Sequence, residues 1–389
     1  RLIGLWNPKM QRRLASERQA LDLLASTEKL HPRIHFHAAS MGELEQCVTV
    51  IEHLTNSGIA LEFTVSSSSP SGYEHALRLN YITVAAYLPL DTVRGVDRFL
   101  SAARPDVIVI DRYDLWPHFI KGASDRGIPI HVINATMPSA GRSLLLRSWV
   151  RATYARVRSI TAVSTHDATQ LSELMRREIQ WKPDTRRDRV VLQKKNIGDQ
   201  FDHLKRTGIT TIVAGSTWPP DEDFLITALR ELNDPTIRVI IVPHEPTEAA
   251  VSRIQGRLPS TRLSQSTSET VGHIIVDNIG KLLALYSLAD AAVVGGGHGV
   301  GVHSVTEPAG YFIPIACGPR IERSNDASFL QQGLALTVVM NTKDLTEWIL
   351  DVVLNNTVRE IVDGELRTFI LANTGASDDY AEMILRDIT

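Results

Sequence analysis

The chain has 389 residues, of which 43% are hydrophobic and 22% charged, and this length predicts two globular domains with ample cores. Its two cysteines, Cys47 and Cys317, exclude a disulfide framework and a thiolate metal site. The net charge of −3 hides an asymmetry, since residues 1–200 hold 27 Lys and Arg against 20 Asp and Glu, whereas residues 201–389 hold 14 against 24. A net of +7 in the first half predicts an anionic partner there.

Apolar runs typical of buried strands alternate with amphipathic helical stretches, which predicts parallel sheets built from βαβ units. Residues 181–207 are polar and are predicted to be irregular, and residues 345–389 are predicted to form consecutive helices with a break at 374–376. The fold class is therefore α/β, with two Rossmann-like domains whose parallel sheets face each other across a cleft. The candidate strands are residues 34–37, 61–65, 107–110, 130–133, 160–163, 210–214, 239–242, 274–276, 291–294 and 313–316.

The segment HAASMGE, residues 37–43, stands where the first strand ends and a helix begins. Ligands bind at the carboxyl ends of strands in open α/β sheets, so Glu43 is a candidate general base. The alternative is a surface acid that stabilises the helix N-terminus. A serine-rich segment at 66–72 ends the next strand and is either a plain turn or part of an acceptor site. The candidate acceptor-binding residues of these two segments are Ser40, Gly42, Ser69 and Gly72.

Asp111, Arg112 and Asp114 follow the strand at 107–110. Burying such side chains is costly unless they pair with one another or with a ligand, so a structural ion pair and a substrate contact stay equally open. Arg112 and Asp114 are further acceptor-binding candidates.

A basic run without any acid occupies residues 141–160. Its Arg147 and Arg151 are predicted to share one helix face. The run is either a solvated basic face or a contact for phosphate or anionic lipid, and we take Arg147 and Arg151 as acceptor-binding candidates. The arginines of the run are Arg142, Arg147, Arg151, Arg156 and Arg158.

The segment from 292 to 320, AVVGGGHGVGVHSVTEPAGYFIPIACGPR, predicts a strand, a glycine loop, a helix start and a second strand. Backbone without side chains lets a ligand approach closely, and a helix N-terminus offers free N–H groups, which together favour a phosphorylated ligand. The loop lacks the lysine of a P-loop and does not fit G-x-G-x-x-G. The alternative, a capping box of Ser304 and Glu307, does not explain five glycines in seven residues. The donor-binding candidates here are Gly296, Gly297, Gly299, Gly301, His303, Ser304 and Glu307.

Two more strand ends in the second half are predicted to lie at the same sheet edge. Asp221, Glu222 and Asp223 imitate the D-x-D of metal-dependent sugar transferases, but we interpret them as acids favoured at a helix N-terminus. His298 and His303 lack a third metal ligand, so no metal is expected. The donor-binding candidates at these strand ends are Gly215, Ser216, Thr217, Pro243 and His244.

Together these segments resemble the Kdo transferases of lipopolysaccharide biosynthesis, which are glycosyltransferases of the GT-B fold. Residues 37–43 are similar to the family's H-A-x-S-x-G-E, which implies that Glu43 is the catalytic base. Residues 87–91 and 114–117 resemble its Y-L-P-x-D and E-L-W-P patterns, and residues 215–218 and 243–244 resemble its donor-side loops. Residues 303–309 are similar to its H-N-x-x-E-P-A, which implies contact with the cytidine nucleotide.

The chain departs from the family's patterns at four positions. Asp114 replaces a Glu, Ser304 replaces an Asn, Thr136 stands where many members have Arg, and Pro183 replaces a Gly. These departures bear on substrate detail and turnover rather than on the fold. On the family's organisation we expect an acceptor domain at 1–195, a donor domain at 205–370 and a helix at 371–389 that is a candidate to pack back on the first domain.

The resemblance implies transfer of Kdo from CMP-Kdo to a lipid A precursor, lipid IVA, with inversion at the anomeric carbon and with no cofactor. The expected partners are CMP-Kdo, the lipid A precursor and an anionic inner-membrane surface, without nucleic acid. The chain has no run of 18 apolar residues and starts at Arg1. Members of the family normally carry an N-terminal hydrophobic anchor, so the resemblance implies an anchor upstream that holds the protein at the cytoplasmic face of the bacterial inner membrane. The alternatives are another GT-B nucleotide-sugar transferase or epimerase, or a non-catalytic relative that binds a CMP-sugar.

Overall fold

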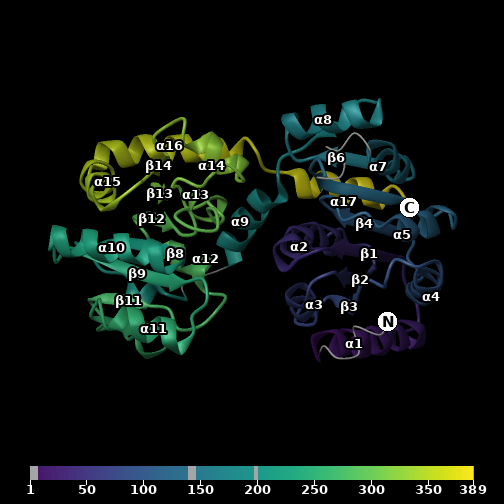
Figure 1. Ribbon diagram of the computed structural model, residues 1–389, viewed down its shortest axis with the longest axis horizontal. Coiled ribbons are helices and arrows are strands. Elements are labelled where there is room, and N and C mark those ends of the chain that lie inside the picture. The colour runs from purple at the N-terminus through teal and green to yellow at the C-terminus, as the bar shows by residue number, and fades with distance from the viewer. Residues whose placement is uncertain (1–7, 139–145, 197–199, 389) are drawn as a thin grey trace. The chain divides into compact units, whose positions relative to one another are not determined.

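The computed structural model describes residues 8–138, 146–196 and 200–388 and divides the chain into two compact units (Figure 1). Unit 1 comprises Arg1–Arg189 and Thr374–Thr389, and unit 2 comprises Val190–Asn373. The boundary falls inside helix α9 (Thr185–Asn196), so unit 2 begins earlier than the predicted position 205, and the returning segment begins slightly after the predicted position 371. Within the described ranges, no helix has both the length and the apolar character that spanning a bilayer requires.

Unit 1 is a seven-stranded parallel sheet in the order β3-β2-β1-β4-β5-β6-β7, with helices on both faces. Its strands are β1 (Arg33–Ala38), β2 (Glu62–Ser67), β3 (Ile82–Tyr87), β4 (Val107–Asp111), β5 (Ile130–Ala135), β6 (Ser159–Ala162) and β7 (Gln180–Trp181). Its helices are α1 (Pro8–Ser26), α2 (Met41–Thr55), α3 (Pro70–Ala76), α4 (Val93–Ala103), α5 (Pro117–Ser124), α7 (Arg147–Tyr154), α8 (Thr165–Met175), the first part of α9, and α17 (Ala376–Leu385).

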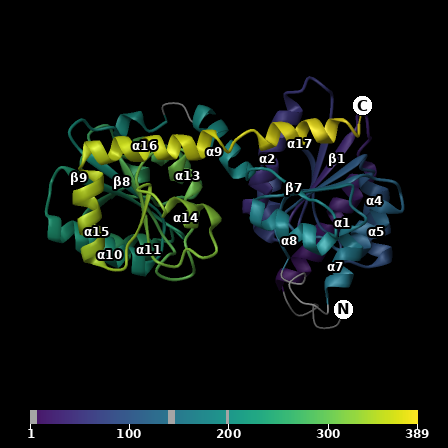
Figure 2. The same ribbon diagram turned by 90° about the horizontal axis from the view of Figure 1, so that it is seen from above.

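The central strand β4 shows why the sheet is covered on both sides. Val107 and Val109 pack in one core with α2 and α17, whereas Ile108 and Ile110 pack in the other with α4 and α5. A strand buried on both faces requires a continuous apolar run, which the sequence provides. Helix α17, which follows unit 2 in the chain, lies beside α2 in unit 1 (Figure 2).

Unit 2 is a second seven-stranded parallel sheet, in the order β10-β11-β9-β8-β12-β13-β14. Its strands are β8 (Thr210–Thr217), β9 (Ile237–Pro243), β10 (Ser260–Arg262), β11 (His273–Ile275), β12 (Ala291–Val294), β13 (Ile315–Cys317) and β14 (Leu336–Val338). Its helices are the second part of α9, α10 (Pro219–Leu232), α11 (Glu248–Gln255), α12 (Leu282–Leu285), α13 (Thr306–Ala309), α14 (Asn325–Leu330), α15 (Thr342–Trp348) and α16 (Asn356–Leu371). The prediction of two Rossmann-like α/β domains is confirmed.

The prediction that residues 181–207 are irregular is wrong for residues 185–196, which form α9. The helix is strongly polar, and Val190, 2% exposed, packs against Gly310 of unit 2. One buried valine in a charged segment gives no helical period, which explains why the sequence pattern missed it.

Candidate active site

The carboxyl ends of β1, β2 and β4 bring the predicted residues of unit 1 together. The parallel register sets His37 of β1 beside Ser66 of β2 and Ile110 of β4. The His37 ring is fully buried, with Nδ1 2.9 Å from the Ser66 hydroxyl and Nε2 2.9 Å from Asp114 Oδ2. Ser68 donates to the same carboxylate oxygen at 2.8 Å. Burial opposes ionisation of Asp114, but the hydrogen bonds from His37 and Ser68 outweigh it and lower its pKa.

Glu43 lies in the first turn of α2, beside this network. Ser40 caps the helix, accepting the Glu43 N–H at 3.3 Å, and Glu43 Oε2 accepts the Ala39 N–H at 2.7 Å. Burial raises the pKa of Glu43, although the Ala39 N–H and the Arg112 charge oppose the shift. Its Oε1 makes no hydrogen bond to any residue that the structure describes. Glu43 therefore both caps the helix and keeps one oxygen for another partner.

Arg112 takes part in a buried polar cluster that the sequence only partly predicted. Arg112 donates to Asp184 at 3.2 Å, and Asn134 donates to Asp111 at 2.7 Å and to Thr185 at 2.9 Å. The sequence left two roles open for Arg112, a structural ion pair and a substrate contact, and the structure contains the ion pair, with Asp184. Asn134 was missed although it follows the predicted strand at 130–133, the same strand-end signal that identified Glu43. Asp184 was missed because it lies in the segment predicted to be irregular.

Asp111 gives this cluster a pH dependence. Burial raises its pKa to about 8, against the opposing effects of Arg112 and Asn134. Between about pH 4 and 8 the folded chain holds a proton that the unfolded chain releases, so the free energy of unfolding falls as pH rises through this window.

Asp111→Asn keeps the acceptor for Asn134 and removes the titration. The effect of the substitution on the free energy of unfolding, variant minus unmodified protein, should be about 1–3 kcal/mol more favourable at pH 8 than at pH 5. Denaturant melts of both proteins at the two pH values measure this, and an unchanged difference would exclude Asp111 as its source.

The second pair of predicted acceptor residues has a local structural role. Ser69 caps α3, accepting the Gly72 N–H at 3.0 Å. A Cβ on Gly72 would lie 2.2 Å from the Ser67 hydroxyl oxygen, so this glycine is required by packing.

Helix α7 carries part of the predicted basic face. Arg156 pairs with Asp125 at 3.7 Å and Arg158 with Asp387 at 2.8 Å, so the idea of an acid-free basic face is wrong for these two, because other elements supply the acids. Arg147 and Arg151 form no ion pair with a described residue, and Arg142 lies outside the described residues. Beside them is a cavity of about 180 Å³. It is lined by Tyr113, Leu115, Pro138, Trp149, Val150, Thr153 and Tyr154.

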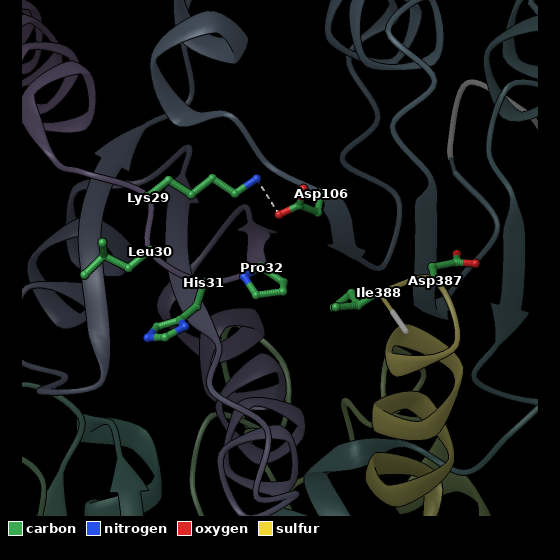
Figure 3. Close-up of a pocket in the computed structure, with 7 residues that line it drawn as sticks. All are labelled: Lys29, Leu30, His31, Pro32, Asp106, Asp387 and Ile388. Carbon is green, nitrogen blue, oxygen red and sulfur yellow. Dashed lines mark ion pairs between the residues drawn. The ribbon is translucent and has the colours of Figure 1, made fainter.

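Another cavity, of about 370 Å³, lies near the amino ends of β1 and β4 (Figure 3). Its charged groups are already paired, Lys29 with Asp106 at 2.6 Å and Asp387 with His131 at 2.8 Å. Ligands of parallel sheets bind at the opposite edge, so we do not assign the site here.

In unit 2 the glycine loop follows β12, beside the end of β8. The Gly295 N–H donates to the Gly215 carbonyl at 2.9 Å. Gly296 has a φ of +88°, and a Cβ on Gly297 would lie 2.6 Å from the Gly318 nitrogen. Close backbone packing and a positive φ therefore give a reason for these two glycines besides the approach of a ligand.

Two further expectations about this loop need correction. The alternative interpretation, a capping box of Ser304 and Glu307, does not hold, since α13 begins at Thr306 with Val305 as its N-cap and without a side-chain cap. The Gly296 N–H is not offered to an anion, because it donates to Asp221 Oδ2 at 2.8 Å. Thr217 is likewise occupied, its hydroxyl donating to Glu222 at 3.1 Å.

What remains at this edge is a set of aromatic and polar side chains. The His244 ring stacks on Trp218 at 4.8 Å and on His303 at 4.5 Å between centroids, and Trp218 Nε1 donates to His303 Nε2 at 3.0 Å. Burial and the neighbouring His244 lower the pKa of His303. Ser216 has a φ of +53°. It lies at the irregularity near the end of the β8–β9 pairing, between Gly215 and the last pair, Thr217 with Pro243. Backbone strain of this kind concentrates at ligand sites. Among the described residues, no group of three His, Cys, Asp or Glu is arranged to hold a metal ion.

Two Rossmann-like domains, each with polar residues gathered at the carboxyl edge of a parallel sheet, define a protein of the GT-B class. The fold is similar to that of UDP-GlcNAc 2-epimerase from Neisseria meningitidis, with a TM-score of 0.64 and 15% identity over 91% of this chain and 100% of that one. It is also similar to MurG from Acinetobacter baumannii, with a TM-score of 0.57 and 15% identity over 91% and 99%. These likenesses show the fold.

Sequence comparisons are more specific. Residues 9–189 match the family model described as 3-deoxy-D-manno-octulosonic-acid transferase (kdotransferase). The chain is 26% identical to the 3-deoxy-D-manno-octulosonic acid transferase of Chlamydophila psittaci, over 76% of this chain and 71% of the relative. It is 24% identical to that of Haemophilus influenzae, over 98% and 93%. A probable mitochondrial transferase of Arabidopsis thaliana is 27% identical, over 83% and 77%. In sequence the chain is therefore similar to the Kdo transferases, which are glycosyltransferases, along most of its length.

Proposed function

We propose that this chain transfers Kdo from CMP-Kdo to a hydroxyl of a lipid A precursor, lipid IVA, with inversion at the anomeric carbon. The observation that carries the proposal is Glu43, a half-buried carboxylate with a raised pKa and an unused oxygen at the carboxyl end of β1. The similarity to Kdo transferases supplies the sugar, and the resemblance of the sequence motifs implies CMP as its carrier.

In this mechanism Glu43 takes the proton of the acceptor hydroxyl while the hydroxyl oxygen attacks the anomeric carbon of Kdo. The bond from that carbon to the phosphate breaks, and CMP departs. A departing phosphate needs hydrogen-bond donors in place before the reaction. We assign that role to Ser216 and the side chains around His244 and His303. The leaving group is a monophosphate, so we expect no divalent cation to be required. Glu307 is assigned to the ribose hydroxyls.

The experiment that tests the proposal is incubation of the purified protein with CMP-Kdo and a tetraacylated lipid A precursor, followed by mass spectrometry. A product heavier by one or more Kdo residues is the expected result. Calorimetry with CMP and with UDP separates this reading from another GT-B activity, which would prefer UDP. Intact CMP-Kdo in the presence of acceptor would indicate a non-catalytic relative.

We further propose that α7 meets the anionic inner-membrane surface and the lipid acceptor, at the cytoplasmic face. The support is that Arg147 and Arg151 are without acidic partners in the described structure, beside Trp149, which is 52% exposed. A cation near an anionic membrane contributes about 1 kcal/mol. Arg147→Gln with Arg151→Gln should therefore weaken binding to anionic vesicles roughly 10- to 30-fold, with a smaller effect at high salt.

The matched control for this prediction is Arg156→Gln with Arg158→Gln, which removes the same charge from residues already paired with acids. Vesicle sedimentation measures both double variants, and CMP affinity should not change in either. Equal losses in the two double variants would mean that only overall charge matters and that α7 is not the contact.

A further inference from the structure

Asp221 and His298 join the glycine loop to the start of α10, and nothing in the proposed reaction uses either residue. Asp221 is 4% exposed. Its Oδ2 accepts the Trp218 N–H at 3.0 Å and the Gly296 N–H at 2.8 Å, and its Oδ1 lies 3.0 Å from His298 Nδ1. One carboxylate thus binds its own helix turn and two residues of the loop.

The second ring nitrogen of His298 reveals the charge of the ring. Nε2 lies 3.0 Å from the carbonyl oxygen of Val339, the residue after β14. A carbonyl can only accept, so Nε2 carries a proton. Two backbone N–H donors on Asp221 favour its ionised form, which also only accepts, so Nδ1 carries a proton too. A ring with protons on both nitrogens is a cation.

The surroundings of His298 agree with this ion pair. Burial opposes ionisation of Asp221, but the hydrogen bonds from His298, Gly296 and Trp218 lower its pKa. The Phe224 ring packs on the imidazole at 4.5 Å between centroids, and the backbone of Gly318, which directly follows β13, lies close to it.

The other acids at the start of α10 are engaged elsewhere, since Glu222 accepts from Thr217 and pairs with Arg253, and Asp223 pairs with Arg257. Burial raises the pKa of the Cys317 thiol to about 12, so it is neutral. The Arg320 guanidinium donates to the Gly299 carbonyl, and His303 Nε2 accepts from Trp218. Asp221 is therefore the carboxylate that faces His298 among the contacts described.

We infer that His298 is an imidazolium whose ion pair with Asp221 holds the glycine loop in position for the nucleotide, so that both are positioning residues for donor binding. The role in donor binding rests on the proposed function, but the charge state of His298 does not. Loss of either contact of the His298 ring would loosen residues 296–298 and lower donor affinity.

The direct test is nitrogen NMR of the full-length protein labelled with ¹⁵N-histidine, with the His298 signals assigned by their loss in His298→Phe. We expect both ring nitrogens to be protonated at neutral pH. Asp221→Asn is the informative variant, because its amide can keep every hydrogen bond while donating to a neutral ring. It should convert His298 to the neutral form, and a neutral ring in the unmodified protein would overturn the inference.

The role in donor binding is tested by CMP calorimetry and by kinetics with CMP-Kdo. His298→Phe, which loses both contacts of the ring, should weaken CMP binding about tenfold and raise KM for the donor, with kcat little changed. Asp221→Asn, which can keep every hydrogen bond, should lose less CMP affinity. His273→Phe is the matched control, since His273 lies in unit 2 and accepts the Val239 N–H at 3.1 Å away from the loop. An equal loss of CMP affinity in that control would overturn the positioning role.

Absence of CMP binding by the unmodified protein would instead defeat the proposed function, and the NMR result would still decide the charge of His298.

Discussion

Glu43→Gln is expected to lower the turnover of Kdo transfer by about 10²- to 10⁴-fold, the range in which a general base contributes. A glutamine side chain has nearly the same size, and its carbonyl oxygen can accept the Ala39 N–H that Glu43 accepts at 2.7 Å. The cap of α2 should therefore survive, while the ability to take a proton is lost. Transfer is measured by mass spectrometry of the lipid product, and CMP calorimetry reports that the donor side is intact.

The neighbouring Glu45 provides the control for this experiment. It lies on the same helix and pairs with His75 at 2.6 Å and with Arg189 at 2.7 Å, so its carboxylate is already occupied. Glu45→Gln should lower stability slightly and leave turnover near that of the unmodified protein. Turnover of Glu43→Gln within a few-fold of the Glu45→Gln value would remove Glu43 from the role of base.

Glu307→Ala is expected to weaken CMP binding by about 1–3 kcal/mol, because the ribose hydroxyls would lose their acceptor. The position of Glu307 supports this assignment. Burial raises the pKa of Tyr286 and the Glu307 charge adds to the rise, and the Tyr286 hydroxyl lies 2.4 Å from the position that a Cβ on Gly215 would take. Glu307 thus acts electrostatically on a tyrosine that adjoins Gly215 in β8. Isothermal titration with CMP measures the change.

Thr306→Ala separates a nucleotide contact from a structural effect on α13. The Thr306 hydroxyl donates to Asp326 at 2.7 Å, so this variant weakens the same short helix without removing the acceptor. We expect it to lower the melting temperature and to leave CMP affinity unchanged. If Glu307→Ala lowers only the melting temperature as well, Glu307 is structural.

The sequence could predict the interior of both sheets. β4, β8 and β12 are buried on both faces, and each carries an apolar run that is visible in the sequence. β1 is also buried on both faces, but its apolar residues alternate with the buried Arg33, His35 and His37. Glu43 was found for a related reason, since the end of a buried parallel strand fixes which edge of the sheet a polar residue occupies. Local pattern was enough in these cases because burial leaves few residue types to choose from.

The four strands that the sequence analysis did not predict are β3, β7, β10 and β14, which form the edges of the two sheets. An edge strand pairs on one side only, and three of these four, β7, β10 and β14, are also short and partly exposed. β3 is longer, with six residues. The existence of an edge strand depends on the neighbour that it pairs with rather than on its own composition.

The tertiary structure also decided what the polar residues do. The sequence presents Arg112, Thr217 and the loop glycines as ligand candidates, but Asp184, Glu222 and Gly318 occupy or crowd them in the fold. Conversely, Asp221 looked like a simple helix acid until the fold brought Gly296 and His298 to it from 75 and 77 residues away. Apolar periodicity is a local property that the sequence by itself determines. A hydrogen bond between distant segments exists only after the strands have paired, which is why the chemistry of these side chains was decided by the tertiary structure alone.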